Sequence, residues 1–259
     1  MSQFVQWSNF SKIAPYAELF RQGIVVTVLL SVFTVAIGFC IALILALMRM
    51  SNVRPFRALG LDKDGHMREG GPLVWISRFN PLSFLATAYV EILRSTPVIV
   101  QVFIIYYGVF GIVQLPSFQI FGFIKFSRFF PGVVALGMNS GAYLCEIIRS
   151  GIQAVDGGQM EAARSVGFSS GEAMRLVVLP QAIRNILPAL GNEFVTVIKE
   201  SSIVSVIGIA DLMFRTNDVI AVTYKNLECL AVAALCYFVL TFVSGRAVSL
   251  AERKLSHGK

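Results

Sequence analysis

The feature that most constrains this chain is a run of 26 residues, Gly23–Met48, that contains neither a charged residue nor a proline. A helix of that length rises about 39 Å, enough to cross the ~30 Å hydrocarbon core of a bilayer with some tilt. A signal peptide is the alternative, but its apolar region usually spans only ~7–15 residues and ends in small residues. This run ends in Leu47-Met48-Arg49, so we interpret it as a membrane span.

The overall composition points the same way. Hydrophobic residues make up 56% of the 259 residues, charged residues 14%, and the mean hydropathy is +0.71. Soluble domains average roughly 25% charged residues, because a surface that faces water needs them. The four cysteines lie in apolar stretches without a CxxC pair and the two histidines are isolated, so the spacing predicts no metal site. We therefore expect an all-α integral membrane protein.

Further apolar stretches bring the predicted number of transmembrane helices to about five. Pro97 is expected in the first turn of the second span, where a proline is tolerated. The fourth span is the weakest, since it contains Glu193, Lys199 and Glu200. The four additional spans are predicted at about Val98–Val113, Phe129–Arg149, Gly191–Ile209 and Leu227–Val248.

The positions of the basic residues predict the orientation, because lysine and arginine are retained on the cytoplasmic side. With the C-terminus inside, 14 of the 22 basic residues fall in inner segments, six in outer segments and two at membrane depth. The N-terminus is therefore predicted outside and the C-terminus inside. The net charge of +7 is explained by this topology, so no nucleic-acid partner is expected.

The chain is divided accordingly into three regions. Residues 1–22 are predicted to form an amphipathic segment on the periplasmic side, 23–250 the transmembrane domain, and 251–259 a cytoplasmic tail. Within the domain, about 58–82 reads as a turn-rich insertion in an inner loop, with Trp75 and Phe79 as possible aromatic anchors at the headgroup level.

A second inner loop, about 155–188, is patterned rather than irregular. Asp156 followed by Gln159, and Ser169 followed by Glu172, have the spacing of capping boxes that begin two short helices. Gly167 is expected to end the first helix in a left-handed turn, and Pro180 to end the second. The apolar faces of such helices either lie on the bilayer or dock into another protein.

The residues of this loop resemble the EAA loop of bacterial ABC importer permeases. The match consists of Glu161-Ala162-Ala163, then Gly167, then Val177-Val178-Leu179-Pro180, with Val177 where the family usually has isoleucine. The flanking strings EILRSTPVIVQVFIIYYG and AYLCEIIRSGIQAVDGG look like the polar amino-acid branch, the histidine/glutamine/arginine-type permeases.

This resemblance implies a type I ABC importer permease fold in the bacterial inner membrane. The implied partners are two ATP-binding subunits, a second permease chain (identical or paralogous) and an extracytoplasmic amino-acid-binding protein. By the same resemblance, the residues that couple to the ATP-binding subunit are Glu161, Ala162, Ala163, Arg164, Gly167, Leu179 and Pro180.

The chain lacks a phosphate-binding GxxxxGK[ST] loop, so we expect no catalytic residue and no cofactor of its own. ATP and Mg²⁺ are expected on the partner subunit.

Asn139, Tyr143 and Glu146 recur at helical spacing and so share one face of the third span. One interpretation is that this face lines the pathway, with Glu146 binding the ammonium group of an amino acid. The other is that Glu146 forms a structural pair with Arg149, Arg94 or Lys199. Arg94, Glu193, Lys199 and Glu200 are expected to pair at the inner mouth.

Two alternatives to an amino-acid permease remain at this point. One is an ABC permease for another small solute, and the other is an ion-coupled secondary carrier. Secondary carriers usually show an internal repeat, and none is evident in this sequence.

Overall fold

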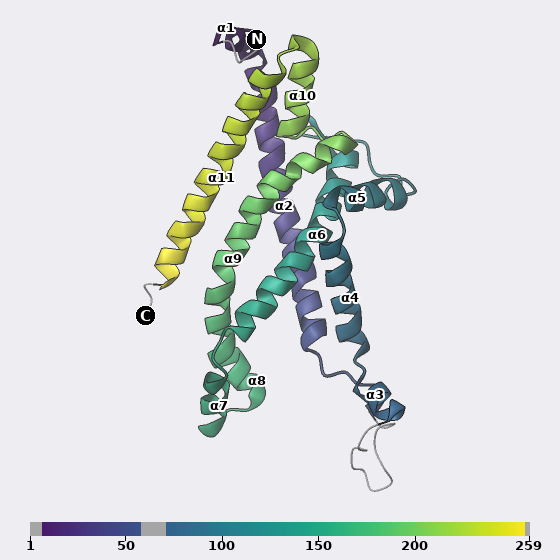
Figure 1. The fold of residues 1–259 in the computed structure, drawn as a ribbon, viewed down its shortest axis with the longest axis vertical. Helices are drawn as coiled ribbons and strands as arrows, with labels where there is room; N and C mark the ends of the chain where they lie inside the picture. Colours follow the sequence, from purple (N-terminus) through teal and green to yellow (C-terminus); the bar gives the residue numbers. More distant parts are fainter. Residues whose placement is uncertain (1–6, 58–70, 257–259) are drawn as a thin grey trace.

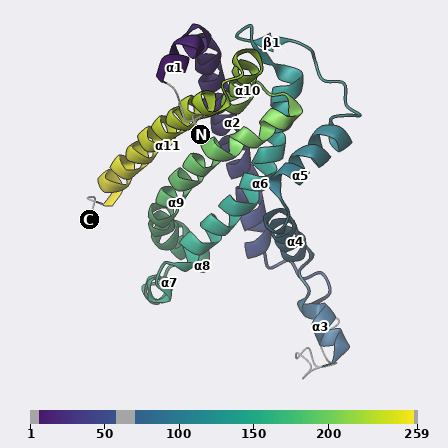
Figure 2. The same ribbon diagram turned by 45° about the horizontal axis from the view of Figure 1, so that its top comes forward.

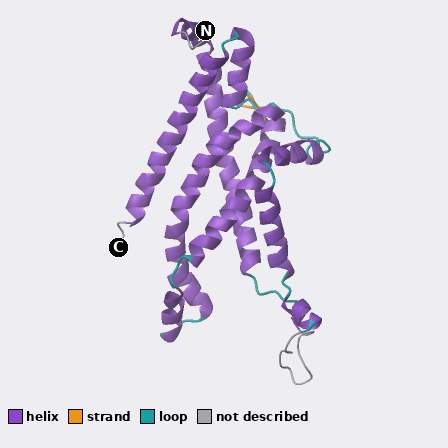
Figure 3. Cartoon of the chain, in the orientation of Figure 1, coloured by secondary structure: helices purple, strands orange, loops and turns teal. Residues whose placement is uncertain are grey.

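The computed structural model describes residues 7–57 and 71–256, and these residues form helices and one short hairpin, joined by loops (Figures 1 and 3). In the hairpin, β1 (Gln119–Ile120) pairs antiparallel with β2 (Ile124–Lys125). The predicted all-α class is confirmed. The helices are α1 (Trp7–Ile13), η1 (Ala14–Tyr16), α2 (Ala17–Met50), α3 (Pro72–Arg78), α4 (Pro81–Ser95), α5 (Val98–Phe103), η3 (Ile104–Val109), α6 (Phe126–Gln153), α7 (Gly157–Ser165), α8 (Ser170–Ala173), η4 (Met174–Val178), α9 (Leu179–Glu200), η5 (Ser201–Ile207), α10 (Leu212–Thr223) and α11 (Asn226–Ser256).

The long helices form an elongated bundle in which α2 packs against α4, α6 and α9, and α11 runs along α9 (Figures 1 and 2). The N-terminus, α1 and α10 lie at one end, and α3, α7 and α8 lie at the other (Figure 1). We call these the outer end and the inner end, after the orientation predicted from the basic residues. The two loops predicted to lie inside thus share one end of the molecule.

The number of membrane spans is only partly settled by length and hydropathy. Within the described residues, the helices over Asn9–Met50 and Asn226–Arg253 qualify, and α4 together with Val98–Val109 makes a third if a bent pair counts as one span. The helices α6 and α9, with 28 and 22 residues, are also long enough to cross. Five spans, with the N-terminus outside, therefore stays a prediction.

Glycines allow α2 and α6 to approach closely at the centre of the bundle. A Cβ atom added to Gly38 would lie 3.1 Å from the backbone nitrogen of Gly141, and one added to Gly141 would lie 2.9 Å from Cγ2 of Ile41. Gly137 and Gly141 are one helical turn apart, the spacing by which small residues bring membrane helices together. At these glycines the backbone of one helix thus packs directly against the backbone and side chains of the other.

The helix of the second span, predicted at about 98–113, begins at Val98 as expected but ends at Val109, and it follows a longer helix that was not predicted. The structure has α4 over 81–95, and the following α5–η3 segment turns away from it by 111°. The cause is Pro97, which disfavours the helical conformation at Thr96; Thr96 is extended, with φ −114° and ψ 146°. The Nε2 of Gln101 donates to the carbonyls of Leu93 and Thr96 at 2.8 and 3.0 Å, satisfying acceptors that the bend frees.

The helix predicted to end at Pro180 continues instead. α8 and the π-helical turn η4 lead directly into α9, which begins at Leu179 and ends at Glu200. Pro180 lies in the first turn of α9, where its missing N–H group costs least. The fourth span, predicted at 191–209, is therefore displaced: α9 lies earlier, and residues 201–207 form the 3-10 helix η5.

At the N-terminal end, α1 and the start of α2 pack against α10 and α11. Ile13 and Phe20 belong to a buried cluster with Leu212 of α10 and Cys229 of α11. Asn9 donates a 2.7 Å hydrogen bond to Glu228. Of the predicted insertion, 58–70 lie outside the described residues, and the remainder contains α3.

Replacing Gly141 by valine tests the close approach of α2 and α6. The new side chain would overlap Ile41 and force the helices apart, at an expected cost of about 1–3 kcal/mol. The matched control is Gly245→Val, because a Cβ at Gly245 meets no atom within 4 Å. We expect thermal unfolding in detergent to show a lower Tm for Gly141→Val only; equal Tm values for the two variants would contradict this packing.

Candidate functional site

The inner-end loop begins with a capped helix. The Oδ1 of Asp156 accepts a 2.7 Å hydrogen bond from the backbone N–H of Gly158, which caps α7. The predicted capping box is wrong in its second half, because the Oε1 of Gln159 accepts from Gln181 of α9 at 3.3 Å. The side chain of Gln159 thus ties α7 to α9 instead of returning to its own N-cap.

Gly167 ends α7 as predicted, with φ +99°. The N–H of Gly167 donates to the carbonyl of Arg164 at 3.1 Å, and that of Phe168 to the carbonyl of Ala163 at 3.2 Å. These two bonds form a Schellman motif, which requires a positive φ at the residue after the C-cap. A side chain at Gly167 would strain this turn.

The second predicted capping box, at the start of α8, is confirmed. The N–H of Ser169 donates to Oε2 of Glu172 at 2.9 Å, and the N–H of Glu172 donates to Oγ of Ser169 at 3.3 Å. The hydrogen bonds from Ser169 hold the pKa of Glu172 below its usual value. The turn between α7 and α8 is therefore fixed at both of its ends.

The loop presents a mixed apolar and basic surface. Val166 is 78% exposed, and Phe168, Leu176, Leu179 and Ile183 are exposed as well. Met160 and Met174 of the same loop are half-buried, and Ala163 is buried. Among the described residues no ion pair involves the exposed arginines of this region, which are Arg164, Arg175 and Arg184. Such a surface suits a partner whose face is apolar with an acidic rim.

The structure separates the three residues predicted to line a pathway. Asn139 is only 2% exposed, and its Nδ2 donates to Oε1 of Gln101 at 3.0 Å and to the carbonyl of Leu93 at 3.3 Å. Tyr143 is 37% exposed, and the guanidinium carbon of Arg94 lies 5.4 Å from the centre of its ring. The side chain of Asn139 is therefore taken up by hydrogen bonds at the bend between α4 and α5, whereas the side chain of Tyr143 is partly exposed.

Glu146 is held by two arginines. Its Oε1 pairs with Arg49 at the end of α2, and its Oε2 lies 2.7 Å from a terminal nitrogen of Arg149. Pairing with Arg149 was one of the predicted alternatives, whereas Arg49 was not considered. Arg49 is the first charge after the long apolar run, but its partner depends on how α2 packs against α6.

The predicted pairing among Arg94, Glu193, Lys199 and Glu200 is wrong. None of the four takes part in an ion pair within the described part of the chain. Glu193 instead accepts a 2.8 Å hydrogen bond from Ser140 of α6. This bond links α9 to the helix that carries Asn139 and Tyr143.

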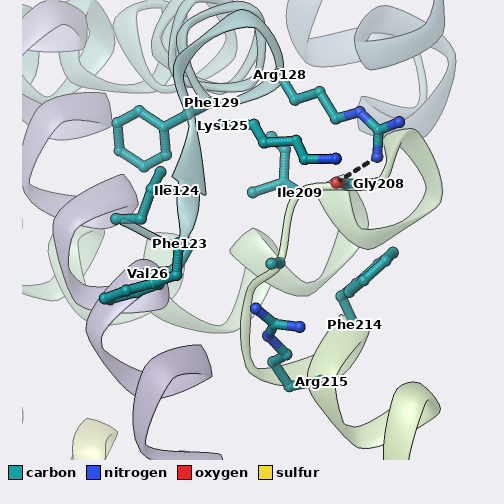
Figure 4. Close-up of a pocket in the computed structure, with 11 residues that line it drawn as sticks. Val26, Phe123, Ile124, Lys125, Arg128, Phe129, Gly208, Ile209, Phe214 and Arg215 are labelled. Carbon is teal, nitrogen blue, oxygen red and sulfur yellow. Dashed lines mark hydrogen bonds between the residues drawn. The ribbon is translucent and has the colours of Figure 1, made fainter. Parts of the chain in front are cut away.

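The sequence did not identify a pocket of about 150 Å³ near the outer end, between α2, α6 and the segment before α10 (Figure 4). Lys125, Arg128 and Arg215 line it (Figure 4). Arg128 donates to the carbonyl of Gly208 at 3.1 Å, and Arg215 pairs with Asp218 at 3.1 Å. Three basic residues in segments predicted to lie outside, where basic residues are normally few, are the signal that could have pointed to it. Its charge suits an anionic group.

Comparison with known proteins decides the family. Residues 71–257 match the family described as "Binding-protein-dependent transport system inner membrane component". The chain belongs to this family. The predicted resemblance to the ABC importer permeases is thereby confirmed, and the chain is a membrane component of a transport system.

This permease is similar over nearly its whole length to curated relatives and solved structures. It is 38% identical to the arginine transport system permease protein ArtQ of Bacillus subtilis, over 95% of this chain and 97% of that one. A putative glutamine transport system permease protein GlnP of Rickettsia bellii is 34% identical, with 94% and 96% covered.

A solved structure of an amino acid ABC transporter with histidines is 40% identical to this chain and superposes with a TM-score of 0.77, over 97% of this chain and all of that one. A MetNI methionine transporter structure reaches a TM-score of 0.61 at 18% identity, over 91% and 97% of the two chains, and shares the fold.

The ion pair between α2 and α6 can be tested by a double-mutant cycle on Arg49→Gln and Glu146→Gln. Arg49→Gln leaves Glu146 paired with Arg149 alone, and Glu146→Gln leaves the partly buried Arg49 without its partner. Each single change should therefore lower the free energy of unfolding, by roughly 1.5–3 kcal/mol where a charged hydrogen-bond partner is lost. Because the two groups are in contact, the double variant should lose less than the sum of the single changes. Denaturant unfolding in detergent measures this; strictly additive losses would show that Arg49 and Glu146 do not interact.

Proposed function

We propose that this permease forms the translocation pathway of an ATP-driven importer for polar amino acids in the bacterial inner membrane. The observation that carries the amino-acid class is the similarity of 38–40% over nearly the whole chain to an arginine permease and to a solved amino acid transporter. The methionine transporter, at 18% identity, supports the fold and not the substrate.

Two such permease chains, identical or paralogous, are proposed to enclose the pathway, with one ATP-binding subunit at the inner end of each. An extracytoplasmic binding protein would deliver the amino acid to the outer end. The chain itself binds no ATP in this proposal, and ATP and Mg²⁺ belong to the partner. The relatives named as transport system permeases support this division of labour.

The inner-end loop is proposed to be the docking element. The Schellman turn at Gly167 and the capping box at Ser169 make it rigid, and Gln159 ties it to α9. The EAA residues, Glu161 to Arg164, lie on α7 next to this turn, and Leu179 and Pro180 open α9. A movement imposed on α7 and α8 is therefore passed to α9 as a rigid-body displacement.

The pathway is proposed to follow the α6 face on which Tyr143 is exposed. Arg94 lies beside this face, with its guanidinium stacked on the Tyr143 ring. The break in the backbone at Pro97 lies beside it as well. Asn139 is proposed to hold this wall in place through Gln101. Contact between Glu146 and the substrate remains a proposal, and the two arginines on its carboxylate favour a structural role in this conformation.

Replacing Gly167 by valine tests the docking element. A β-branched residue resists the φ of +99°, so the turn between α7 and α8 should deform and the ATP-binding subunit should be lost. The control is Gly171→Val, because Gly171 lies within α8 and a Cβ there meets no atom within 4 Å.

The measurement is affinity purification of each tagged permease variant from native membranes in mild detergent, followed by mass spectrometry. The wild type and Gly171→Val should bring down a soluble protein with a phosphate-binding loop, and Gly167→Val should bring down several-fold less. Equal recovery with the Gly167 variant would contradict the docking role.

A further inference from the structure

The structure leaves an aromatic surface exposed at the inner end, next to the start of α4. Trp75 is 84% exposed, and Ile76 and Phe79 of the same helix are exposed with it. With Phe56 they line a shallow groove of about 250 Å³. The opposite side of α3 carries Val74 and Ser77, which are buried, so α3 has one covered and one open face.

We propose that this surface, made of Phe56, Trp75, Ile76 and Phe79, is an anchor that inserts into the inner leaflet and binds anionic lipid. This inference goes beyond the proposed transport function and does not depend on which solute is carried.

The position of α3 along the chain places the anchor at the membrane boundary. The charge-free run of α2 ends at Met48, and only two residues separate the end of α3 at Arg78 from the start of α4 at Pro81. Figure 1 shows α3 just beyond the inner ends of α2 and α4. A tryptophan at this depth is in the interfacial region that tryptophan prefers.

The apolar surface continues onto α4. The ring of Phe79 contacts that of Phe84, with centroids 5.5 Å apart, and Phe84 and Leu85 are exposed on the first turns of α4. A continuous apolar strip from α3 to the outside of a transmembrane helix is what a lipid contact requires.

The basic residues beside the aromatic surface favour the binding of anionic lipid over neutral lipid. Arg54, Arg57 and Arg78 are exposed, and no acidic residue occurs in the described residues 49–57 and 71–80. Over the whole segment 51–80, the sequence holds five basic residues against three acidic ones. Basic residues next to a membrane helix are attracted by the negative surface of the cytoplasmic leaflet.

Asn80 connects the anchor to the pathway wall. Its Nδ2 donates to the carbonyl of Ser51 after α2 at 2.6 Å, and its Oδ1 accepts from the N–H of Ser83, which caps α4. Asn80, which follows Phe79 of the anchor, therefore joins the end of α2 to the start of α4, the helix that carries Arg94.

Tryptophan fluorescence tests the proposal directly, because the chain has only two tryptophans, Trp7 and Trp75. The full chain with Trp7→Phe leaves Trp75 as the single probe. It is reconstituted into vesicles of equal parts phosphatidylcholine and phosphatidylglycerol, with bromine placed either near the headgroup end or near the methyl end of the acyl chains. The Trp75→Phe chain, which reports only Trp7, is the reference if Trp7→Phe destabilises the protein, and subtraction from the wild type then yields the Trp75 signal.

We expect Trp75 to emit at shorter wavelength than an exposed tryptophan and to be quenched more strongly by bromine near the headgroup end. Replacing Arg54, Arg57 and Arg78 by glutamine, or using phosphatidylcholine alone, should reduce this quenching, whereas Arg184→Gln should not. A Trp75 that emits as in water and is not quenched by either lipid would overturn the proposal. A blue-shifted emission without quenching would also overturn it, since the surface would then be covered by protein, such as a second copy of the chain.

Discussion

The close contact between α2 and α6 is the interaction on which the rest of the structure depends. In a lipid environment helices gain little from burying apolar side chains against one another, so close packing of small residues becomes the main source of association. Gly38 and Gly141 allow the two backbones to meet. Both the pairing of Arg49 with Glu146 and the position of α3 and α7 at the same end of the molecule depend on this contact.

The polar groups inside the bundle follow a second constraint, which is that the membrane interior offers no water to satisfy them. The bend after α4 leaves backbone carbonyls without helical partners. Gln101 donates hydrogen bonds to the carbonyls of Leu93 and Thr96, and Asn139 donates one to that of Leu93. Glu193 accepts a hydrogen bond from Ser140, and Glu146 forms ion pairs with two arginines. A broken helix is tolerated here because the side chains of neighbouring helices replace the missing hydrogen bonds.

Local signals in the sequence predicted what local interactions determine. The turn at Gly167 and the Ser169–Glu172 capping box involve residues only a few positions apart, and both were found as expected. The second and fourth spans show where that reasoning ends. Pro97 turns the chain between α4 and α5, whereas Pro180 lies in the first turn of α9 and ends no helix. The effect of a proline depends on where the helix around it begins, and the residue type alone does not fix that. The Arg49–Glu146 pair and the outer basic pocket join residues about 80 or more positions apart, so no spacing rule could reveal them.

The central claim is that this chain forms an amino-acid pathway opened by a partner that hydrolyses ATP. The most direct measurement is uptake of labelled arginine and glutamine into vesicles that contain the purified permease with its co-purified subunits and binding protein, with ATP enclosed. The account predicts that uptake of one of these amino acids requires hydrolysable ATP and stops when a non-hydrolysable analogue replaces it. Uptake by the permease alone, driven by an ion gradient without ATP, would contradict the account and indicate a secondary carrier.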